Sequence, residues 1–230
     1  MKTIGMIGGM SWSSTVLYYQ ALNEIVHRRL GGRHSAKLVL WSVNFAEHLA
    51  IHEEGGWQAV TEESVQMGEG LRAAGADFLM LCVNTLHMVS DEIETRVGLP
   101  LLHIADPTGA AAREAGVRKI GLLGTRYTMG EAFYRDRLAG RHGLEVLVPE
   151  GEDFGTIDAM IFDELVVDRY TDTARRSCLD VIGRLVDRGA QGIILGCTEL
   201  PKLLEGAEIP VPTFDTLALH AEAAVSAALA

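Results

Sequence analysis

The chain has 230 residues, of which 48% are hydrophobic and 22% are charged, and its formal net charge is −11. This composition is typical of a folded globular protein, and its scattered basic residues argue against a nucleic-acid partner, because phosphate binding needs clustered Lys and Arg. No run approaches the roughly 18 apolar residues of a transmembrane helix, and glycines interrupt the apolar run in the first ten residues, so we expect neither a membrane anchor nor a secretory signal. The three cysteines lack CxxC spacing, so we expect neither a disulfide framework nor a zinc site. A cytoplasmic protein fits these features.

Short β-branched and leucine-rich runs alternate along the chain with longer stretches of helical period, which is typical of βαβ units on a parallel sheet. The predicted strands cover residues 3–7, 37–43, 78–83, 100–104, 119–123, 145–148, 192–195 and 211–214. The predicted helices cover residues 13–29, 58–74, 107–115, 130–141, 156–167 and 171–188, with a last helix from residue 217. The pattern therefore predicts an α/β protein.

Two sequence matches indicate an internal repeat. The segment 4–8 (IGMIG) matches 120–124 (IGLLG), and the segment 75–81 (GADFLML) matches 189–195 (GAQGIIL). Either match alone could be a chance likeness between two strands with glycines, but the matches come in the same order and at nearly equal offsets. A duplicated half is therefore the better interpretation.

The repeat predicts two pseudo-symmetric, doubly wound α/β domains whose parallel sheets face a central cleft. We expect residues 1–104 plus 212–230 in the first domain and residues 105–211 in the second. Ligands of open α/β sheets bind at the carboxyl ends of the strands, so the candidate site residues should follow the strands directly.

At two strand ends the chain passes from apolar residues straight into side chains that can act on a ligand. Extending the second match without a gap pairs Cys82 with Gly196 and Val83 with Cys197. A thiol at the start of a helix feels the positive end of the helix dipole, which can lower its pKa towards neutrality. The backbone N–H groups of the same turn can hold a carboxylate. Racemisation of an amino acid needs both functions, with an acid/base group on each side of Cα.

The motifs resemble those of the Asp/Glu/hydantoin racemase superfamily, which includes aspartate and glutamate racemases. The motifs are Ile-Gly-Gly-Met at 7–10, Asn84-Thr85 with His87, His-Ile-Ala-Asp at 103–106, Gly-Thr-Arg-Tyr-Thr at 124–128 and Gly-Cys-Thr-Glu at 196–199. The resemblance implies two pseudo-symmetric domains, a small amino-acid substrate, catalysis without pyridoxal phosphate or another cofactor, and a homodimer. The four lysines lack a Schiff-base context, which agrees with this.

One position departs from the family pattern. The first catalytic cysteine of the family stands directly before Asn-Thr, where this chain has Val83. Three interpretations stay open. A bulge at the strand end could turn Cys82 into the site. Alternatively, another group or a water, acting through His87 or His52, could serve as the second base, or the site could have one working thiol, Cys197.

Each of these interpretations predicts a function. Two acid/base groups predict a racemase. One thiol predicts a lyase like arylmalonate decarboxylase, a member of the same superfamily, or a binding protein that has lost its chemistry. The family's aspartate racemases use a basic residue in the segment that corresponds to 161–166, and this chain has none there, so preference for aspartate or glutamate stays open.

Further residues are candidates for substrate binding, and each has a purely structural alternative. Turn residues after the first strand and the two strand-end motifs could hold the carboxylate and ammonium groups, or could merely form tight turns and helix caps. Arg126 could hold a side-chain carboxylate by a two-pronged contact, or could be a surface arginine. The candidates are Gly9, Met10, Ser11, His52, Asn84, Thr85, Thr125, Arg126, Thr198 and Glu199.

Overall fold

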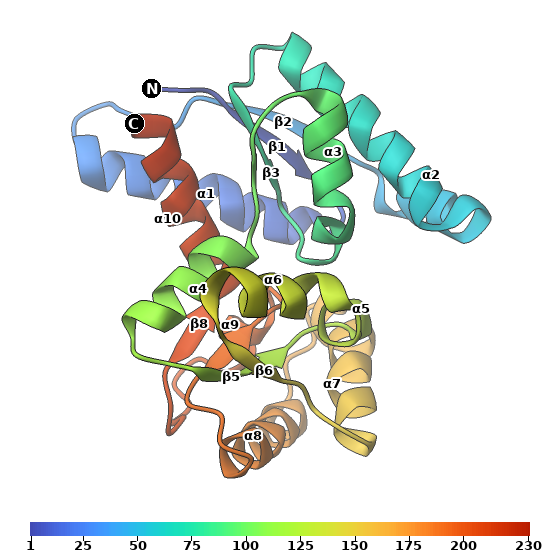
Figure 1. Ribbon diagram of the computed structural model, residues 1–230, viewed down its shortest axis with the longest axis vertical. Helices are drawn as coiled ribbons and strands as arrows, with labels where there is room; N and C mark the ends of the chain where they lie inside the picture. The colour runs from blue at the N-terminus through green and yellow to red at the C-terminus, as the bar shows by residue number, and fades with distance from the viewer. The chain divides into compact units, whose positions relative to one another are not determined.

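The computed structural model describes all residues from 1 to 230 and contains two compact units (Figure 1). The first unit comprises Met1–Ile104 and His220–Ala230, and the second comprises Ala105–Leu219. Each unit contains a four-stranded sheet in which all neighbouring strands are parallel. The predicted α/β class is therefore confirmed.

The first unit has the strand order β2-β1-β3-β4. Its strands are β1 (Ile4–Gly8), β2 (Leu38–Ser42), β3 (Phe78–Leu81) and β4 (Leu101–Leu102). Its helices are α1 (Trp12–Leu30), α2 (Phe45–Ala73), the 3-10 helix η1 (Thr85–Val89), α3 (Ser90–Val97) and, from His220 on, α10 (Thr216–Leu229). Helices α1 and α10 lie side by side on one face of the sheet, and α2 and α3 cover the other face (Figure 1).

The second unit repeats this order as β6-β5-β7-β8. Its strands are β5 (Lys119–Leu123), β6 (Glu145–Leu147), β7 (Ile193–Leu195) and β8 (Thr213–Asp215). Its helices are α4 (Ala105–Glu114), α5 (Arg126–Gly130), α6 (Ala132–His142), α7 (Glu152–Asp163), the 3-10 helix η2 (Leu165–Val167), α8 (Asp172–Asp187) and α9 (Leu200–Leu203).

The two sheets agree in register as well as in strand order. Gly5 stands opposite Leu79 in the first sheet, and the repeat partners of these two residues, Gly121 and Ile193, stand opposite each other in the second. The two sequence matches therefore correspond to equivalent strand pairs, β1 with β3 and β5 with β7. The central cleft between the sheets stays a prediction.

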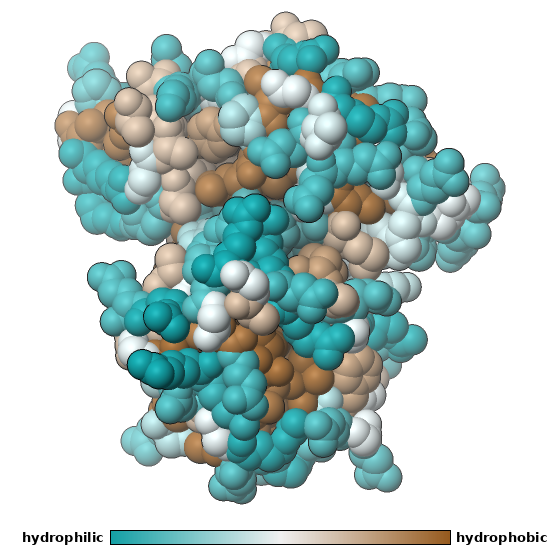
Figure 2. All heavy atoms as spheres, viewed as in Figure 1, coloured by the Kyte–Doolittle hydropathy of each residue, from teal (hydrophilic) through white to brown (hydrophobic).

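Each unit has its own hydrophobic core. Helices cover both faces of its parallel sheet, so the central strands are buried on both sides and consist of apolar residues. Strands β1 and β3 are buried along their whole length. The edge strands β2 and β6 are more exposed. Figure 2 shows apolar atoms at the surface of the second unit over β6.

The helix prediction was incomplete in both units. Helix α2 begins at Phe45, well before the predicted residue 58, because the Asn44 side chain caps it and a kink at Gly56 lets the chain continue. Four short helices that were not predicted follow strand ends or turns, namely η1, α3, α5 and α9. Such short helices are fixed by tertiary contacts and carry little periodic signal of their own.

The border between the units differs from the predicted domain border. We expected residues 212–230 to join the first domain, but β8 pairs with β7, so residues up to Leu219 belong to the second unit. The chain returns to the first unit only within α10, where His220 contacts Tyr18 of α1. Among the helices, none is both long and apolar enough to cross a membrane.

Candidate functional site

The thiol of Cys197 lies in the turn that follows β7. The hydrogen bond from the Gly196 N–H to the Leu123 carbonyl ends the pairing of β7 with β5, and the chain then turns into α9. The thiol is half-buried and donates to the Oε2 atom of Glu199 at 2.8 Å, and the Thr198 hydroxyl donates to the same oxygen, also at 2.8 Å. Glu199 is 8% exposed. The predicted Gly-Cys-Thr-Glu motif thus forms a compact thiol–hydroxyl–carboxylate cluster.

This environment raises the pKa of the Cys197 thiol well above its usual value. Burial is the largest cause, followed by the negative charge of the Glu199 carboxylate and by the hydrogen bond to it. The backbone N–H groups of Thr198 and Glu199 lower the pKa, which is the helix-end effect predicted from the sequence. That effect is outweighed, because α9 has only four residues and a carboxylate accepts the thiol proton. At rest, Cys197 is therefore a thiol beside a proton acceptor.

The first-unit counterpart of this turn follows β3. The Cys82 N–H donates to the Ile7 carbonyl at 2.8 Å, as the Gly196 N–H does to Leu123. Cys82 therefore matches Gly196, and Val83 matches Cys197, as the ungapped repeat predicted. Cys82 is 3% exposed and burial raises the pKa of its thiol, whereas Val83 is only partly buried. The structure shows the thiol packed inside the first unit and the valine at the position equivalent to Cys197.

His87 holds the turn after Val83. Its Nδ1 atom lies 3.0 Å from the Val83 carbonyl and 3.2 Å from the Asn84 carbonyl, so Nδ1 carries the proton and donates to these acceptors. Asn84 is buried and Thr85 is half-buried at the start of η1. The imidazole is buried, and burial together with the neighbouring His103 and His220 lowers its pKa well below the usual value. His87 is therefore a neutral group that shapes the turn.

The turn after β1 uses its polar groups internally. The Gly9 N–H donates to Oγ1 of the buried Thr15 at 2.9 Å. The Ser11 side chain caps α1 by accepting from the Ser14 N–H, and Met10 is buried in the core of the first unit. The structural alternative, a tight turn with a helix cap, therefore describes these contacts. The sequence reasoning missed Thr15, whose signal is a hydroxyl in the first turn of a helix that follows glycines.

Arg126 is also engaged within its own unit. Its backbone N–H and its Nε donate to the two carboxylate oxygens of Asp158 on α7, both at 2.7 Å. Asp158 is 2% exposed, and Thr125 caps α5 beside it. The sequence reasoning missed Asp158, although an acid between the apolar residues Ile157 and Ile161 indicates a buried partner. The pair holds the turn after β5 against α7 and fixes the direction of the guanidinium.

His52 belongs to a helix and not to one of the strand-end turns of its unit. It is on α2, where its ring packs edge-to-face against Trp57 with 4.9 Å between the ring centroids. The buried Cys178 lies in the core of the second unit, as expected for a packing cysteine. Asp106 accepts from Arg137, which ties α4 to α6.

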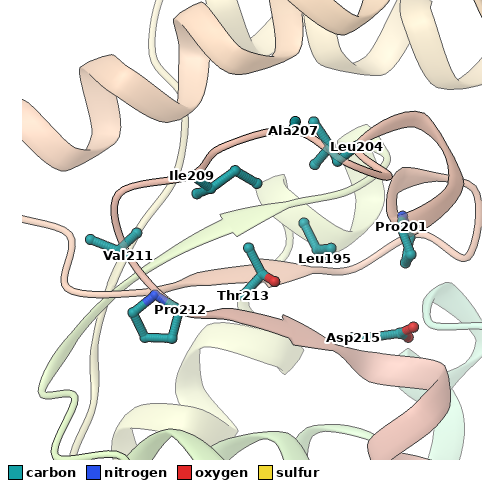
Figure 3. A pocket seen from close by; sticks show the side chains of 9 residues that line it. All are labelled: Leu195, Pro201, Leu204, Ala207, Ile209, Val211, Pro212, Thr213 and Asp215. Atoms are coloured by element: carbon teal, nitrogen blue, oxygen red, sulfur yellow. The ribbon is translucent and has the colours of Figure 1, made fainter.

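A cavity of about 390 Å³ opens in the second unit beside β7 (Figure 3). Figure 3 shows side chains of the segment 204–212 opposite those of β7 and β8, and most of them are apolar. Asp215 is its one acidic residue, and burial raises the pKa of that carboxyl although two backbone N–H groups of α10 donate to it. Cys197 is not among the lining residues. No cluster of three or more His, Cys, Asp or Glu side chains is placed to hold a metal ion.

Comparison with known proteins points to one family. The model of the Asp/Glu/Hydantoin racemase family matches residues 7–224. The crystal structure of a proposed Asp/Glu racemase from Yersinia pestis is 46% identical in sequence, with a TM-score of 0.95 and complete coverage of both chains. An aspartate racemase homologue from Pyrococcus horikoshii OT3 is 32% identical, with a TM-score of 0.87 and complete coverage of both chains.

A curated relative points the same way. The broad specificity amino-acid racemase RacX of Bacillus subtilis (strain 168) is 24% identical over 233 residues, which cover 99% of this chain and 98% of the relative. The matches extend over both repeated sheets and include the strand-end turns around Cys82 and Cys197. The chain therefore belongs to the Asp/Glu/Hydantoin racemase family, and the resemblance deduced from its motifs is confirmed.

Proposed function

We propose that this chain is a cofactor-independent amino-acid racemase in which the Cys197 sulfur exchanges the α-proton of the substrate. The observation that carries the proposal is the 2.8 Å contact between the Cys197 thiol and the Glu199 carboxylate. A racemase must produce a base strong enough to remove a weakly acidic α-proton. Transfer of the thiol proton to Glu199 produces a thiolate of high basicity, because the pKa of this thiol is raised.

The proposed reaction conserves its protons. The Cys197 thiolate takes the proton from Cα and becomes a thiol again, while the electron pair of the broken C–H bond stays on the substrate as a carbanion stabilised by its carboxylate. A second acid then gives a proton to the opposite face of Cα and becomes a thiolate. Exchange with water afterwards removes the proton from Glu199 and returns one to this thiolate, which restores the enzyme. We propose Cys82 as this acid, since it is the single cysteine of the first unit and lies one residue from the position that corresponds to Cys197. A buried thiol with a raised pKa holds its proton at neutral pH, as a donor must.

The proposed substrate is a small amino acid, aspartate, glutamate or a related one, and the proposed assembly is a homodimer. The similar proteins named above act on, or are assigned to, aspartate, glutamate or a broad range of amino acids. The candidate residues for holding the substrate's carboxylate and ammonium groups are those at the strand-end turns, with Asn84, Thr85 and Thr198 foremost. Arg126 is a weaker candidate, because Asp158 already accepts from its guanidinium.

Deuterium exchange tests the proposal. In heavy water the wild-type protein should label Cα of its substrate and interconvert the enantiomers, when the common amino acids of both hands are screened by mass spectrometry and chiral chromatography. Cys197→Ala should abolish both reactions. Cys178→Ala is the matched control, because it removes a thiol on the buried face of α8, in the core of the second unit. Exchange that survives in Cys197→Ala would overturn the proposal.

A second candidate function is a lyase with a single thiol, and two observations favour it. Val83 occupies the position equivalent to Cys197, and Cys82 is 3% exposed. In such an enzyme, Cys197 would protonate the carbanion left when a substituted malonate loses carbon dioxide. Cys82→Ala separates the two functions. It should abolish interconversion of enantiomers by a two-thiol racemase and leave a lyase unchanged, for which carbon dioxide release from arylmalonates is the assay.

A further inference from the structure

The cavity beside β7 lies where the two repeated units differ. In the first unit, the connection from β3 to β4 contains the eight-residue helix α3, whose buried Ile93 and Val97 belong to the core. In the second unit, the equivalent connection from β7 to β8 contains only the four-residue helix α9, and residues 204–212 form turns and irregular backbone. The second connection therefore covers less of its sheet, and the cavity lies between it and the strands (Figure 3).

The walls of the cavity belong to the second unit alone and are mostly apolar. Its lining residues all lie between Leu195 and Asp215, and only Thr213 and Asp215 among them have polar side chains. Figure 3 shows Val211 at one end of the cavity and Asp215 at the other. The volume of about 390 Å³ falls within the roughly 300–1,000 Å³ of pockets that bind small molecules. The cavity thus has the size and the walls to hold the apolar body of a small ligand.

The carboxylate of Asp215 is only partly used by the protein. Its Oδ1 atom accepts from the backbone N–H groups of Leu217 and Ala218 at 2.9 and 3.2 Å, at the start of α10. Its Oδ2 atom accepts from no protein group, and no Lys, Arg or His side chain forms an ion pair with the carboxylate. Burial of a charge without a partner costs free energy, and here it raises the pKa of Asp215. A cation bound at Oδ2 would supply the missing partner.

The chemistry around Asp215 selects the kind of cation. The chain carries a net charge of −11, which attracts cations and repels anions. A metal ion is a poor match, because Ca²⁺ takes about six to eight oxygen ligands and the cavity offers side-chain oxygens from Thr213 and Asp215 alone. An ammonium group needs only one carboxylate for a strong, charge-assisted hydrogen bond. An apolar body attached to it can then contact the remaining walls.

From these observations we infer that the cavity binds a small organic ammonium ion, namely a primary amine with a branched or cyclic apolar body. The ammonium group donates to Oδ2 of Asp215, and the body packs between Leu195 of β7 and Leu204 at the end of α9. The inference does not rest on the proposed racemase chemistry, because Cys197 does not line the cavity. It adds a second ligand site to the unit that carries Cys197.

Titration with an amine and with its uncharged analogue tests the inference. The probe is cyclohexylmethylamine, which is an ammonium ion at pH 7. The full wild-type chain should bind one molecule with a Kd of about 1 mM, as expected for a ligand of about eight non-hydrogen atoms. Cyclohexylmethanol has the same body without the charge and should bind at least about tenfold more weakly. In NMR spectra, methyl resonances of Leu195, Ile209 and Val211 should shift as the amine is added.

Variants locate the binding site. Asp215→Asn keeps a side-chain oxygen for the cap of α10 but removes the charge, so the amine should bind at least about tenfold more weakly. Asp172→Asn is the matched control, because it removes the charge of an exposed acid in the first turn of α8, and the Kd should not change. Ala207→Phe places a ring at the wall of the cavity and should abolish binding of both the amine and the alcohol. Circular dichroism establishes that each variant is folded.

A further variant separates this site from the proposed function. Cys197→Ala should bind the amine as tightly as the wild type does, whether or not the chain is a racemase. Loss of binding in Cys197→Ala would overturn the inference, because the amine would then occupy the candidate catalytic turn. Absence of the methyl shifts at amine concentrations about tenfold above the expected Kd, equal affinities for the amine and the alcohol, or an unchanged Kd in Asp215→Asn would overturn it as well.

Discussion

At the scale of single residues, the chemistry depends on how one carboxylate acts on one thiol. Glu199 raises the pKa of Cys197 through its negative charge and through its hydrogen bond, and it also accepts the thiol proton. A raised pKa has two opposite effects on the reaction rate. A high pKa gives a strong base, but only a small fraction of the sulfur is ionised at neutral pH. The reaction should therefore accelerate as the pH rises towards the pKa of the thiol.

Replacement of the carboxylate should move this pH dependence. Glu199→Gln removes the negative charge, so the pKa of Cys197 should fall and its thiolate should appear at lower pH. The measurement is the rate of alkylation of Cys197 by iodoacetamide as a function of pH, followed by mass spectrometry, beside the pH profile of racemisation. Glu205→Gln, an exposed residue a few positions along the chain, serves as control. A profile that stays in place or moves to higher pH would contradict the role given to Glu199.

At the scale of elements, the strand-end turns are held by contacts within their own units. The turn after β1 packs so closely against the residues that follow β2 that a Cβ atom at Gly9 would lie 2.5 Å from the backbone N and O atoms of Val43. Gly9 also has a φ of +93°, in the region that favours glycine. Two independent constraints therefore select glycine at the head of α1.

These constraints can be separated by mutation. Gly9→Ala should lower the free energy of unfolding by at least about 3 kcal/mol, because backbone strain and a clash with main-chain atoms add together. Gly31→Ala, at the other end of α1, has a φ of +68° with open space around it, so only backbone strain acts there and the loss should be smaller, about 2 kcal/mol. Urea denaturation of both variants gives the comparison. Equal losses would show that steric contact with Val43 does not matter.

At the scale of the whole molecule, the last helix is joined to the first unit by a group of buried histidines. The Nε2–H of His220 donates to the Leu102 carbonyl at 2.9 Å, so its Nδ1 accepts from the Tyr18 hydroxyl at 3.1 Å. The ring of His87 lies 5.7 Å from His220 and 4.6 Å from His103, measured between centroids. All three imidazoles are buried. Burial lowers the pKa of His220 to about 4.

This arrangement should make the chain sensitive to acid. The unfolded chain binds a proton at His220 near pH 6.5 and the folded chain only near pH 4, so stability is lost as the pH falls between these values, by about 3 kcal/mol in all. His220→Gln can keep both hydrogen bonds and cannot titrate. Its free energy of unfolding should fall less than that of the wild type between pH 7 and pH 4. Parallel pH curves for the two proteins would contradict this explanation.

The amino-acid sequence alone determined the α/β class, all eight strands, the repeat and the family, because each of these follows from local periodicity or from short motifs at strand ends. It also placed Val83 in register with Cys197. The tertiary structure decided the hydrogen-bond partners of the candidate site residues. Cys197 pairs with Glu199, the Gly9 N–H with Thr15, and Arg126 with Asp158. The sequence could not predict the burial that raises the pKa of the Cys197 thiol, because this burial depends on how a turn packs among elements far apart in the chain.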